Sequence, residues 1–414
     1  MPTYAKRIFL LLLSFAWAGL PGQAVSLPDE VDRAEEKLEL LEEGSLERTF
    51  LRDMDFSPDD KILAVSYANR PPAQVAVASG RILNVLGYSP DEELKRRELS
   101  RRLRQDPTIA GAERVGHGGF SLASNSLLRR VNDINAITYS PDGKQVAGAG
   151  AGVLKLYDAQ SGREEQVISI TETAALTHAQ DPQYFVSMVA SMGGSGLLGG
   201  SWGVGSSSVE YSQDGKLVAV CQPYGCSVRS SKDGKEVYGF HHSDRMGGRY
   251  FARFSPEGKE LAVVCQTTGM ERSACRLDIL DAQSGKILRT YQKRWPYGDL
   301  RWSQDGKRLA FFTVEGKLVE LDSADFRELA VLPGGDRLSF SPDGRYLVVS
   351  DREEGARIME VMSGKIVKRF YQDFPDAVRG IRARPVAWSH NGKTIAVGGE
   401  EYMVYFWDVG ALKQ

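Results

Sequence analysis

The sequence is poor in the residue types on which many catalytic and metal sites depend. Only 5 His and 4 Cys occur among 414 residues, so few side chains are available as a general base or a transition-metal ligand. An excess of charge of one sign is also missing, because 52 Lys and Arg stand against 54 Asp and Glu. The net charge of -2 favours neither a nucleic-acid-binding protein nor a polyanion mimic.

Long hydrophobic runs are missing as well, except for one near the N-terminus. Residues 8–20 are almost all apolar, follow two basic residues and end at Pro21. A membrane-spanning helix needs about 20 apolar residues, whereas a shorter apolar run after a basic start is typical of a secretory signal peptide. We predict that residues 1–24 are a signal peptide, cleaved after Ala18 or Ala24. The mature chain would then be periplasmic or secreted, with no transmembrane span.

The four cysteines bear on this predicted compartment. Cys221 and Cys226 bracket a short loop between two strand-like runs, and so do Cys265 and Cys275. Residues that face each other in an antiparallel hairpin have Cα atoms about 4.5 to 5.5 Å apart, which a disulfide can bridge. In an oxidising compartment we expect the disulfides Cys221–Cys226 and Cys265–Cys275, and the alternative is four reduced thiols. The spacing lacks the Cys-x-x-Cys pairs typical of a four-cysteine metal site.

A short repeat is the most prominent feature of the sequence. It consists of an aromatic residue, Ser, any residue, an acidic residue or Asn, Gly or Asp, and a basic residue. In the form Ser-Pro-Asp-Gly, Pro sets a φ near -65°, Asp bonds back to its own turn and Gly adopts a positive φ. Each copy therefore predicts a tight turn between two β-strands. The seven copies begin at Phe56, Tyr139, Tyr211, Phe254, Trp302, Phe340 and Trp388.

Each repeat continues with an apolar run and then with a third and a fourth strand-like segment, as in residues 153–170. Four strands are the number that a propeller blade needs. The repeat resembles the WD-repeat β-propeller family, in the bacterial style in which the aromatic-Ser-Pro-Asp-Gly turn is the best preserved element. The resemblance covers residues 44–414, although the Trp-Asp dipeptide itself occurs only at Trp407-Asp408. It implies an all-β fold, a seven-bladed β-propeller of four-stranded antiparallel blades.

The two ends of the chain are predicted to share the last blade. The seventh repeat reaches the C-terminus just after its third strand, whereas Gly44–Phe50 matches the fourth strand of a complete repeat at Gly285–Tyr291. Pairing these segments would cover an exposed sheet edge. The preceding residues 25–43 have apolar side chains at helical spacing in an acidic segment. They predict an N-terminal helix that packs on the propeller or serves as a partner-binding helix.

Two connections between repeats are much longer than a repeat of about 40 to 45 residues allows. The first, residues 87–133, contains a helix start at Ser89-Pro-Asp-Glu92, and the second, residues 171–208, is rich in Gly and Ser. Both join the fourth strand of one blade to the first strand of the next. In a propeller they emerge on the same face as the loops between second and third strands.

This elaborated face is the predicted binding surface, because loops on a rigid scaffold commonly carry function. Its candidate contacts are basic, aromatic and histidine side chains of the connections: Arg97, Arg101, His241, His242, Arg245, Arg249, Arg294, Trp295, Tyr297, Arg379, Arg382 and Arg384.

No catalytic, cofactor-binding or metal-ligating constellation is evident in the sequence. Gly199-Gly-Ser201-Trp-Gly203 imitates a nucleophile elbow, and residues 194–199 imitate a dinucleotide-binding loop. Both lie in a Gly-rich insertion without the strand and helix that such motifs require. We therefore expect no cofactor and a non-enzymatic interaction or scaffold module of the cell envelope that binds a protein partner. The alternative is a propeller enzyme or ligand-binding protein that uses the central channel.

Overall fold

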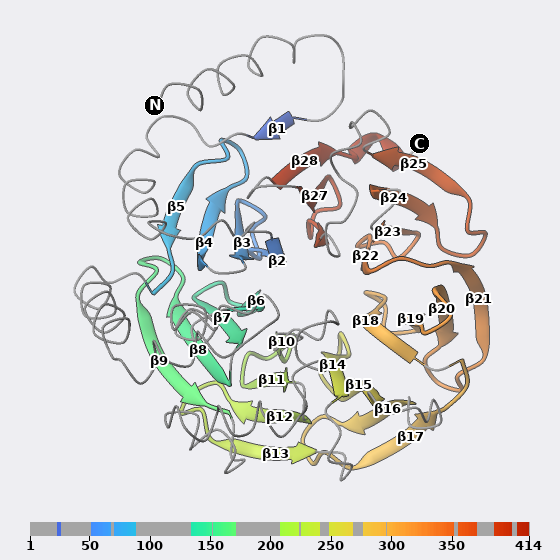
Figure 1. Cartoon of the computed structure of the whole chain (residues 1–414), viewed down its shortest axis with the longest axis horizontal. Helices are drawn as coiled ribbons and strands as arrows, with labels where there is room; N and C mark the ends of the chain where they lie inside the picture. The colour runs from blue at the N-terminus through green and yellow to red at the C-terminus, as the bar shows by residue number, and fades with distance from the viewer. Residues whose placement is uncertain are drawn as a thin grey trace, which may run out of the picture.

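A computed structural model shows a ring of seven four-stranded antiparallel sheets around a central axis (Figure 1). It describes residues 23–25, 51–67, 70–87, 134–150, 152–170, 208–222, 225–240, 248–267, 276–294, 296–351, 355–370, 385–399 and 404–413. The predicted seven-bladed all-β propeller is therefore confirmed. Of the segment predicted to be an N-terminal helix, Val25 lies in a β-strand and residues 26–43 lie outside the described residues, as does the helix predicted after Ser89. None of the described residues forms a helix that is long and apolar enough to cross a membrane.

The blades follow one another in chain order, and within each blade the first strand is the innermost and the fourth the outermost. Blades 1 to 3 are β2 (Leu51–Phe56), β3 (Ile62–Tyr67), β4 (Arg70–Ala76) and β5 (Ile82–Val85); β6 (Ala136–Tyr139), β7 (Gln145–Gly150), β8 (Val153–Asp158) and β9 (Glu164–Ser169); and β10 (Ser208–Tyr211), β11 (Leu217–Gln222), β12 (Gly225–Ser230) and β13 (Glu236–Phe240). Blades 4 and 5 are β14 (Gly248–Phe254), β15 (Glu260–Thr267), β16 (Arg276–Asp281) and β17 (Ile287–Tyr291); and β18 (Pro296–Trp302), β19 (Arg308–Thr313), β20 (Lys317–Asp322) and β21 (Glu328–Pro333). Blades 6 and 7 are β22 (Arg337–Phe340), β23 (Tyr346–Asp351), β24 (Gly355–Glu360) and β25 (Ile366–Phe370); and β26 (Val386–Trp388), β27 (Thr394–Gly398), β28 (Val404–Asp408) and β1 (Gln23–Val25), followed by the 3-10 helix η4 (Gly410–Lys413).

The core consists of seven clusters of buried apolar side chains, each between two consecutive blades. In the cluster between blades 4 and 5, the rings of Tyr291 and Phe311 meet edge to face with centroids 5.7 Å apart. The cluster that joins Phe56 of blade 1 to Phe406 of blade 7 completes the ring. Each blade thus buries both of its faces, and no blade has a core of its own.

The two faces of the ring differ in their connections. On one face, which we call the turn face, every connection from first to second strand and from third to fourth strand has five residues, as in 57–61 and 77–81. On the opposite face, which we call the variable face, the connections range from 2 residues (68–69) to 50 residues (86–135).

A buried serine in each turn between first and second strands explains the constant length of these seven turns. In blade 5, the Ser303 hydroxyl donates to Asp305 Oδ1 at 2.6 Å, and its Oγ accepts the Arg308 N–H at 3.0 Å. The same Oγ bond to the residue five positions later occurs in all seven blades. Because these serines are all buried, a longer or shorter turn would leave a buried hydroxyl and an amide without partners. The turn predicted from the repeat is therefore confirmed.

The outer strand of blade 7 is β1, and the prediction that Gly44–Phe50 closes this blade stays a prediction. β1 pairs antiparallel with β28 in a register that sets Val25 opposite Val404, so an N-terminal segment does close the ring. The predicted closing strand was Gly44–Phe50, which lies outside the described residues. Similarity to another fourth strand shows that a segment can form a strand, but it does not determine which edge that segment pairs with.

The seam between blades 7 and 1 is also held on the turn face, by Asp60. Six repeats have a glycine with a φ between 66° and 73° at this turn position, whereas Asp60 adopts a φ of 59°. Its carboxylate accepts the backbone N–H groups of His390 at 2.7 Å and Asn391 at 2.8 Å, and His390 Nδ1 lies 2.9 Å from Oδ1. The hydrogen bonds across the seam compensate for a backbone conformation that is unfavourable for a residue with a Cβ.

We predict that Asp60→Gly destabilises the protein, although glycine suits the left-handed backbone better. Loss of two charge-assisted hydrogen bonds should outweigh the relief of strain and lower the free energy of unfolding by about 1 to 2 kcal/mol. Chemical denaturation of both proteins measures this difference. Asp60→Asn, which keeps one acceptor oxygen and tolerates the same backbone, should fall between them. A glycine variant as stable as the wild type would contradict the stabilising role of these bonds across the seam.

Candidate functional site

The innermost strands of the seven blades surround the axis of the ring (Figure 1). In five of these strands, charged side chains stand one or three positions before the aromatic residue of the repeat. We call them the channel cluster, which consists of Asp53, Asp55, Glu210, Arg253, Asp299, Arg301 and Arg337. Arg253 and Asp299 are buried, and the other five are partly exposed.

Strand alternation places the charges of the channel cluster on one side of each inner strand. The residues between and beside them, such as Met54, Leu300 and Leu338, are buried in the apolar clusters between blades. Because successive side chains of a strand point to opposite sides, the charged residues project away from these apolar clusters.

Each carboxylate of the channel cluster accepts a backbone N–H group from the inner strand of the following blade. These bonds join strands that belong to different sheets, so they link the blades around the channel. The pairs are Asp53 with Ile137 at 3.1 Å, Asp55 with Tyr139 at 2.8 Å, Glu210 with Phe254 at 2.6 Å and Asp299 with Leu338 at 3.4 Å.

Asp299 pairs with two arginines of the channel cluster. Its Oδ1 lies 3.0 Å from Arg301 Nη1 and 3.5 Å from Arg253 Nη2, and the residue is only 1% exposed. Burial acts to raise its pKa, but the guanidinium groups of Arg301 and Arg253 outweigh burial and hold the pKa below its ordinary value. Asp299 is therefore an ionised partner of two arginines.

The carboxylates of Asp53 and Glu210 differ from that of Asp299 in their ion pairs. Within the described part of the chain, no Lys or Arg nitrogen lies within 4.0 Å of either carboxylate. Burial raises the pKa of Glu210 to about 7, although the charge of Arg253 opposes this shift. Burial also raises the pKa of Asp53, against the opposing fields of Arg337, Arg253 and Arg301. The charges of these arginines thus act on both carboxyl groups, although no ion pair is formed within 4.0 Å.

The guanidinium group of Arg337 has fewer described contacts than those of Arg253 and Arg301. Its Cζ lies 6.0 Å from the centroid of the Phe251 ring, a distance suited to a cation–π contact. Among the described residues, it forms no ion pair and no hydrogen bond through its side chain.

Most of the residues predicted as partner contacts are not placed by the structure. Arg294 is described, and its guanidinium binds Glu328, with Nη2 and Nε each 3.0 Å from Oε2. Arg249 and Tyr297 lie in the inner strands β14 and β18, not in connections, although their side chains are not described. The other predicted contacts lie outside the described residues: Arg97, Arg101, His241, His242, Arg245, Trp295, Arg379, Arg382 and Arg384.

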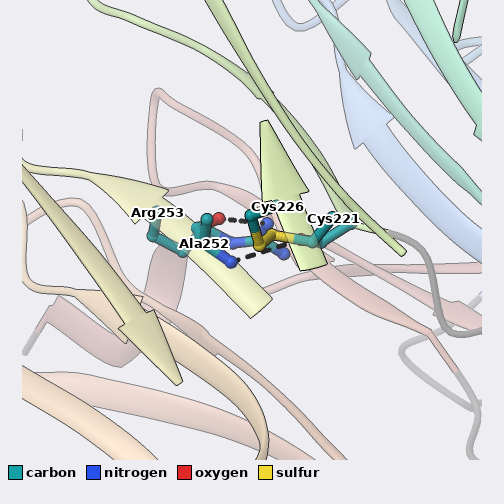
Figure 2. Close-up of a disulfide and its surroundings, with 5 residues drawn as sticks. Cys221, Cys226, Ala252 and Arg253 are labelled. Carbon is teal, nitrogen blue, oxygen red and sulfur yellow. Dashed lines mark hydrogen bonds between the residues drawn. A yellow bond between two sulfur atoms is a disulfide. The ribbon is translucent and has the colours of Figure 1, made fainter. Parts of the chain in front are cut away.

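The predicted disulfide Cys221–Cys226 is present (Figure 2). The two cysteines are opposite each other in the hairpin of β11 and β12, with Cα atoms 4.0 Å apart, at the variable face. They pack in the cluster between blades 3 and 4, beside Ala252 of β14.

The second predicted disulfide, Cys265–Cys275, stays a prediction, because Cys275 lies outside the described residues. The register sets Cys265 opposite Arg276, so the residue after Cys275 in the sequence takes the directly facing position.

The channel cluster was missed by the sequence analysis. A signal for it is present when the repeats are aligned, because polar and apolar residues alternate in Asp53-Met-Asp55-Phe56 and in Asp299-Leu-Arg301-Trp302. Such alternation indicates a strand with one polar side.

No protein-family model matches the chain, and no curated protein matches it at a significant level. Within the described ranges, no group of three or more His, Cys, Asp or Glu could hold a metal ion. The class that the structure defines is the seven-bladed β-propeller.

The raised pKa of Glu210 predicts a pH-dependent stability that Glu210→Gln removes. The folded-state pKa of about 7 exceeds the ordinary value of 4.5. The contribution of the neutral carboxyl is therefore complete below pH 4.5 and is lost as the pH rises through 7. Melting temperatures between about pH 5 and pH 8 should fall more for the wild type than for the variant. Glu315→Gln, at an exposed position, should behave like the wild type, and identical pH profiles for all three proteins would disprove the assignment.

Proposed function

We propose that the protein is a non-enzymatic interaction or scaffold module that binds a protein partner through the variable face. The observation that carries this proposal is the difference between the faces. Connections on the turn face all have five residues, whereas those on the variable face range from 2 to 50. Propellers are commonly used for protein interaction, and loops that vary on a rigid scaffold commonly carry the binding residues.

The centre of the proposed binding surface is blade 2. The two longest connections are residues 86–135, which lead from β5 into β6, and residues 170–207, which lead from β9 to β10. They enter and leave the same blade, so both begin or end beside it on the variable face. A partner that contacts both insertions would cover blade 2 and its junctions with blades 1 and 3.

The proposed setting is the cell envelope, after export. The N-terminal basic and apolar segment supports export, and the disulfide Cys221–Cys226 is of the kind that persists in oxidising compartments. Membership of the WD-repeat family is part of the same proposal and rests on the repeated turn.

Export and ring closure together predict where the signal peptide is removed. Cleavage after Ala18 keeps β1 intact, whereas cleavage after Ala24 leaves only Val25 of this strand to cover the edge of β28. We therefore expect the intact mass of the exported protein to correspond to a chain that begins at Gly19. A mature chain that begins at Val25 would reject β1 as the closing strand and return that role to Gly44–Phe50. A full-length chain retained in the cytoplasm would reject export.

The interaction proposal predicts that the two insertions are required for partner binding but not for folding. We would replace residues 88–133 and 171–207, separately and together, by short Gly-Ser loops and then cross-link and affinity-purify the proteins from their own cells. The shortened proteins should keep the melting temperature of the wild type and lose the partner.

The matched control for this experiment changes the turn face. Lys144→Ala and Lys216→Ala remove side chains that are 80% exposed there, and they should leave partner capture unchanged. A partner retained by the doubly shortened protein, or lost from the lysine variants, would reject the variable face as the binding surface.

A further inference from the structure

Glu320 of β20 is an ionisable side chain in the apolar layer between blades 5 and 6. Its partners in the register, Ala310 of β19 and Ala330 of β21, both belong to this layer. Directly paired residues of an antiparallel sheet point to the same side of the sheet, so the side chain of Glu320 points toward blade 6. The residue is 0% exposed, and its carboxyl group is therefore fully withdrawn from water.

The carboxyl group of Glu320 has one incomplete partner. Among the described residues, no hydrogen bond is donated to Oε1 or Oε2, and the cation within 4.0 Å is Arg308 of β19, with Nη1 3.5 Å from Oε1. This distance is longer than that of a typical N–H···O hydrogen bond. Arg308 donates through Nη2 to the backbone oxygen of Gly344 in blade 6 at 2.7 Å. An ionised Glu320 is thus a buried charge that is only partly compensated, which is costly.

The side chains that face Glu320 from blade 6 are apolar. The nearest further charge on the same side of β20 is Asp322, which pairs with Arg327 at 3.7 Å on the turn face. Asp343 and Arg345 lie in the first turn of blade 6 and are exposed. The part of the layer that blade 6 contributes consists of Leu338, Phe340, Leu347, Val349, Met359 and Val361.

Blade 1 shows how a neutral group occupies the same position. Gln74 is the counterpart of Glu320, because each pairs with an alanine of the second strand and stands directly before the register shift of its third strand. Gln74 Nε2 donates to Tyr139 Oη at 2.8 Å and to the Ala159 backbone oxygen at 2.9 Å. Its Oε1 accepts a hydrogen bond from Asn84 Nδ2 at 2.8 Å. A side chain that can donate a hydrogen bond therefore suits this place in the ring.

The layer between blades 5 and 6 keeps one of these three partners. Its repeat aromatic is Phe340, which lacks a hydroxyl, and its fourth strand has Ala330 where blade 1 has Asn84. The backbone oxygen of Val361 corresponds to the one that Gln74 binds, because both residues donate their N–H group to the basic residue of the preceding turn. A neutral carboxyl has one O–H donor for such an oxygen, whereas an ionised carboxylate only accepts.

We propose that Glu320 makes the junction between blades 5 and 6 a pH-sensitive contact, which is closed while the carboxyl is neutral and loosens when the carboxyl ionises. The neutral form donates its O–H to the Val361 oxygen. The ionised form gains hydration when the junction opens, so opening becomes more favourable. Burial raises the pKa of Glu320 to about 7, although the charge of Arg308 opposes this shift. This device goes beyond the proposed partner interaction and does not depend on it.

The stability of the closed junction should fall with rising pH. The pKa of about 7 in the folded protein exceeds the ordinary value of 4.5. The contribution of the neutral carboxyl is therefore complete below pH 4.5 and is lost as the pH rises through 7. Between about pH 6 and pH 8, the equilibrium constant for opening should increase about tenfold.

Cysteine labelling measures the opening of single junctions. Ala310→Cys places a thiol beside Glu320, and Ala147→Cys places one at the same position of blade 2, opposite Leu156. Both alanines are 0% exposed, so a thiol reagent reacts there only when the blades separate. The ratio of the two labelling rates, followed by peptide mass spectrometry of the mature protein, cancels the pH dependence of the thiol reaction. We expect this ratio to rise about tenfold between about pH 6 and pH 8.

Two substitutions of Glu320 in the Ala310→Cys protein assign the effect. Glu320→Gln keeps the shape of the side chain and can donate to Val361 as Gln74 does in blade 1, and Glu320→Leu introduces the residue type of blade 2. Both should make the labelling ratio independent of pH. Glu315→Gln, at an exposed position of the same blade, is the matched control and should leave the tenfold rise unchanged.

Each outcome supports or overturns the pH-sensitive contact. A rise that both Glu320 variants abolish and Glu315→Gln keeps supports it. A constant ratio in the protein with Glu320, or a rise that persists in Glu320→Gln, would overturn it. An equal increase in labelling at the Ala310→Cys and Ala147→Cys sites would also overturn it, because the whole ring would then open rather than one junction. Melting temperatures at about pH 6 show which variants fold, and either Glu320 variant alone is enough for the comparison.

Discussion

The buried serine of the five-residue turn is the contact on which the rest of the ring depends. Its hydroxyl holds the acidic or Asn side chain of the turn in most blades, and in all seven blades its oxygen holds the amide of the second strand. This makes the offset between first and second strands identical from blade to blade. The aromatic residue before each serine then reaches the same height in every inter-blade layer. The position one residue earlier falls on a common level in every blade, as do Asp53 and Arg337 three residues earlier, whereas Asp299 lies in a bulge of β18.

The carboxylates of the channel cluster also bind backbone N–H groups at the axis of the ring that have no strand partner. The innermost strand of a blade is a sheet edge, and the N–H groups on the edge that faces the axis have no strand to pair with. In this ring, carboxylates of the preceding blade accept several of them, as Asp53 does for Ile137 and Glu210 for Phe254. The same carboxylates therefore join the inner strands of neighbouring blades, which belong to different sheets.

What could be predicted from the sequence was what short stretches of chain determine. Each turn and the disulfide Cys221–Cys226 follow from residues within one hairpin, and the blade number follows from the seven copies of the turn. The Arg294–Glu328 ion pair and the grouping of the channel cluster depend on which distant segments meet. The alternation of polar and apolar residues indicates that an inner strand has one polar side, but it does not determine which charges of different blades meet there. Glu320 is a feature that the repeat does not indicate. It is fully buried on β20, with Oε1 3.5 Å from Arg308 Nη1 of the neighbouring strand, at a position where other blades have Leu156, Val228 or Ile279.

The same serine contact explains why the two faces of the ring can have separate tasks. An insertion in a turn between first and second strands would break the bonds of a buried hydroxyl and change the offset of an inner strand. The connection of residues 86–135 lies on the variable face, away from these serines, and is fifty residues long while β5 and β6 keep their places in the ring. Variation in loop length is thus confined to the face where it leaves the channel unchanged.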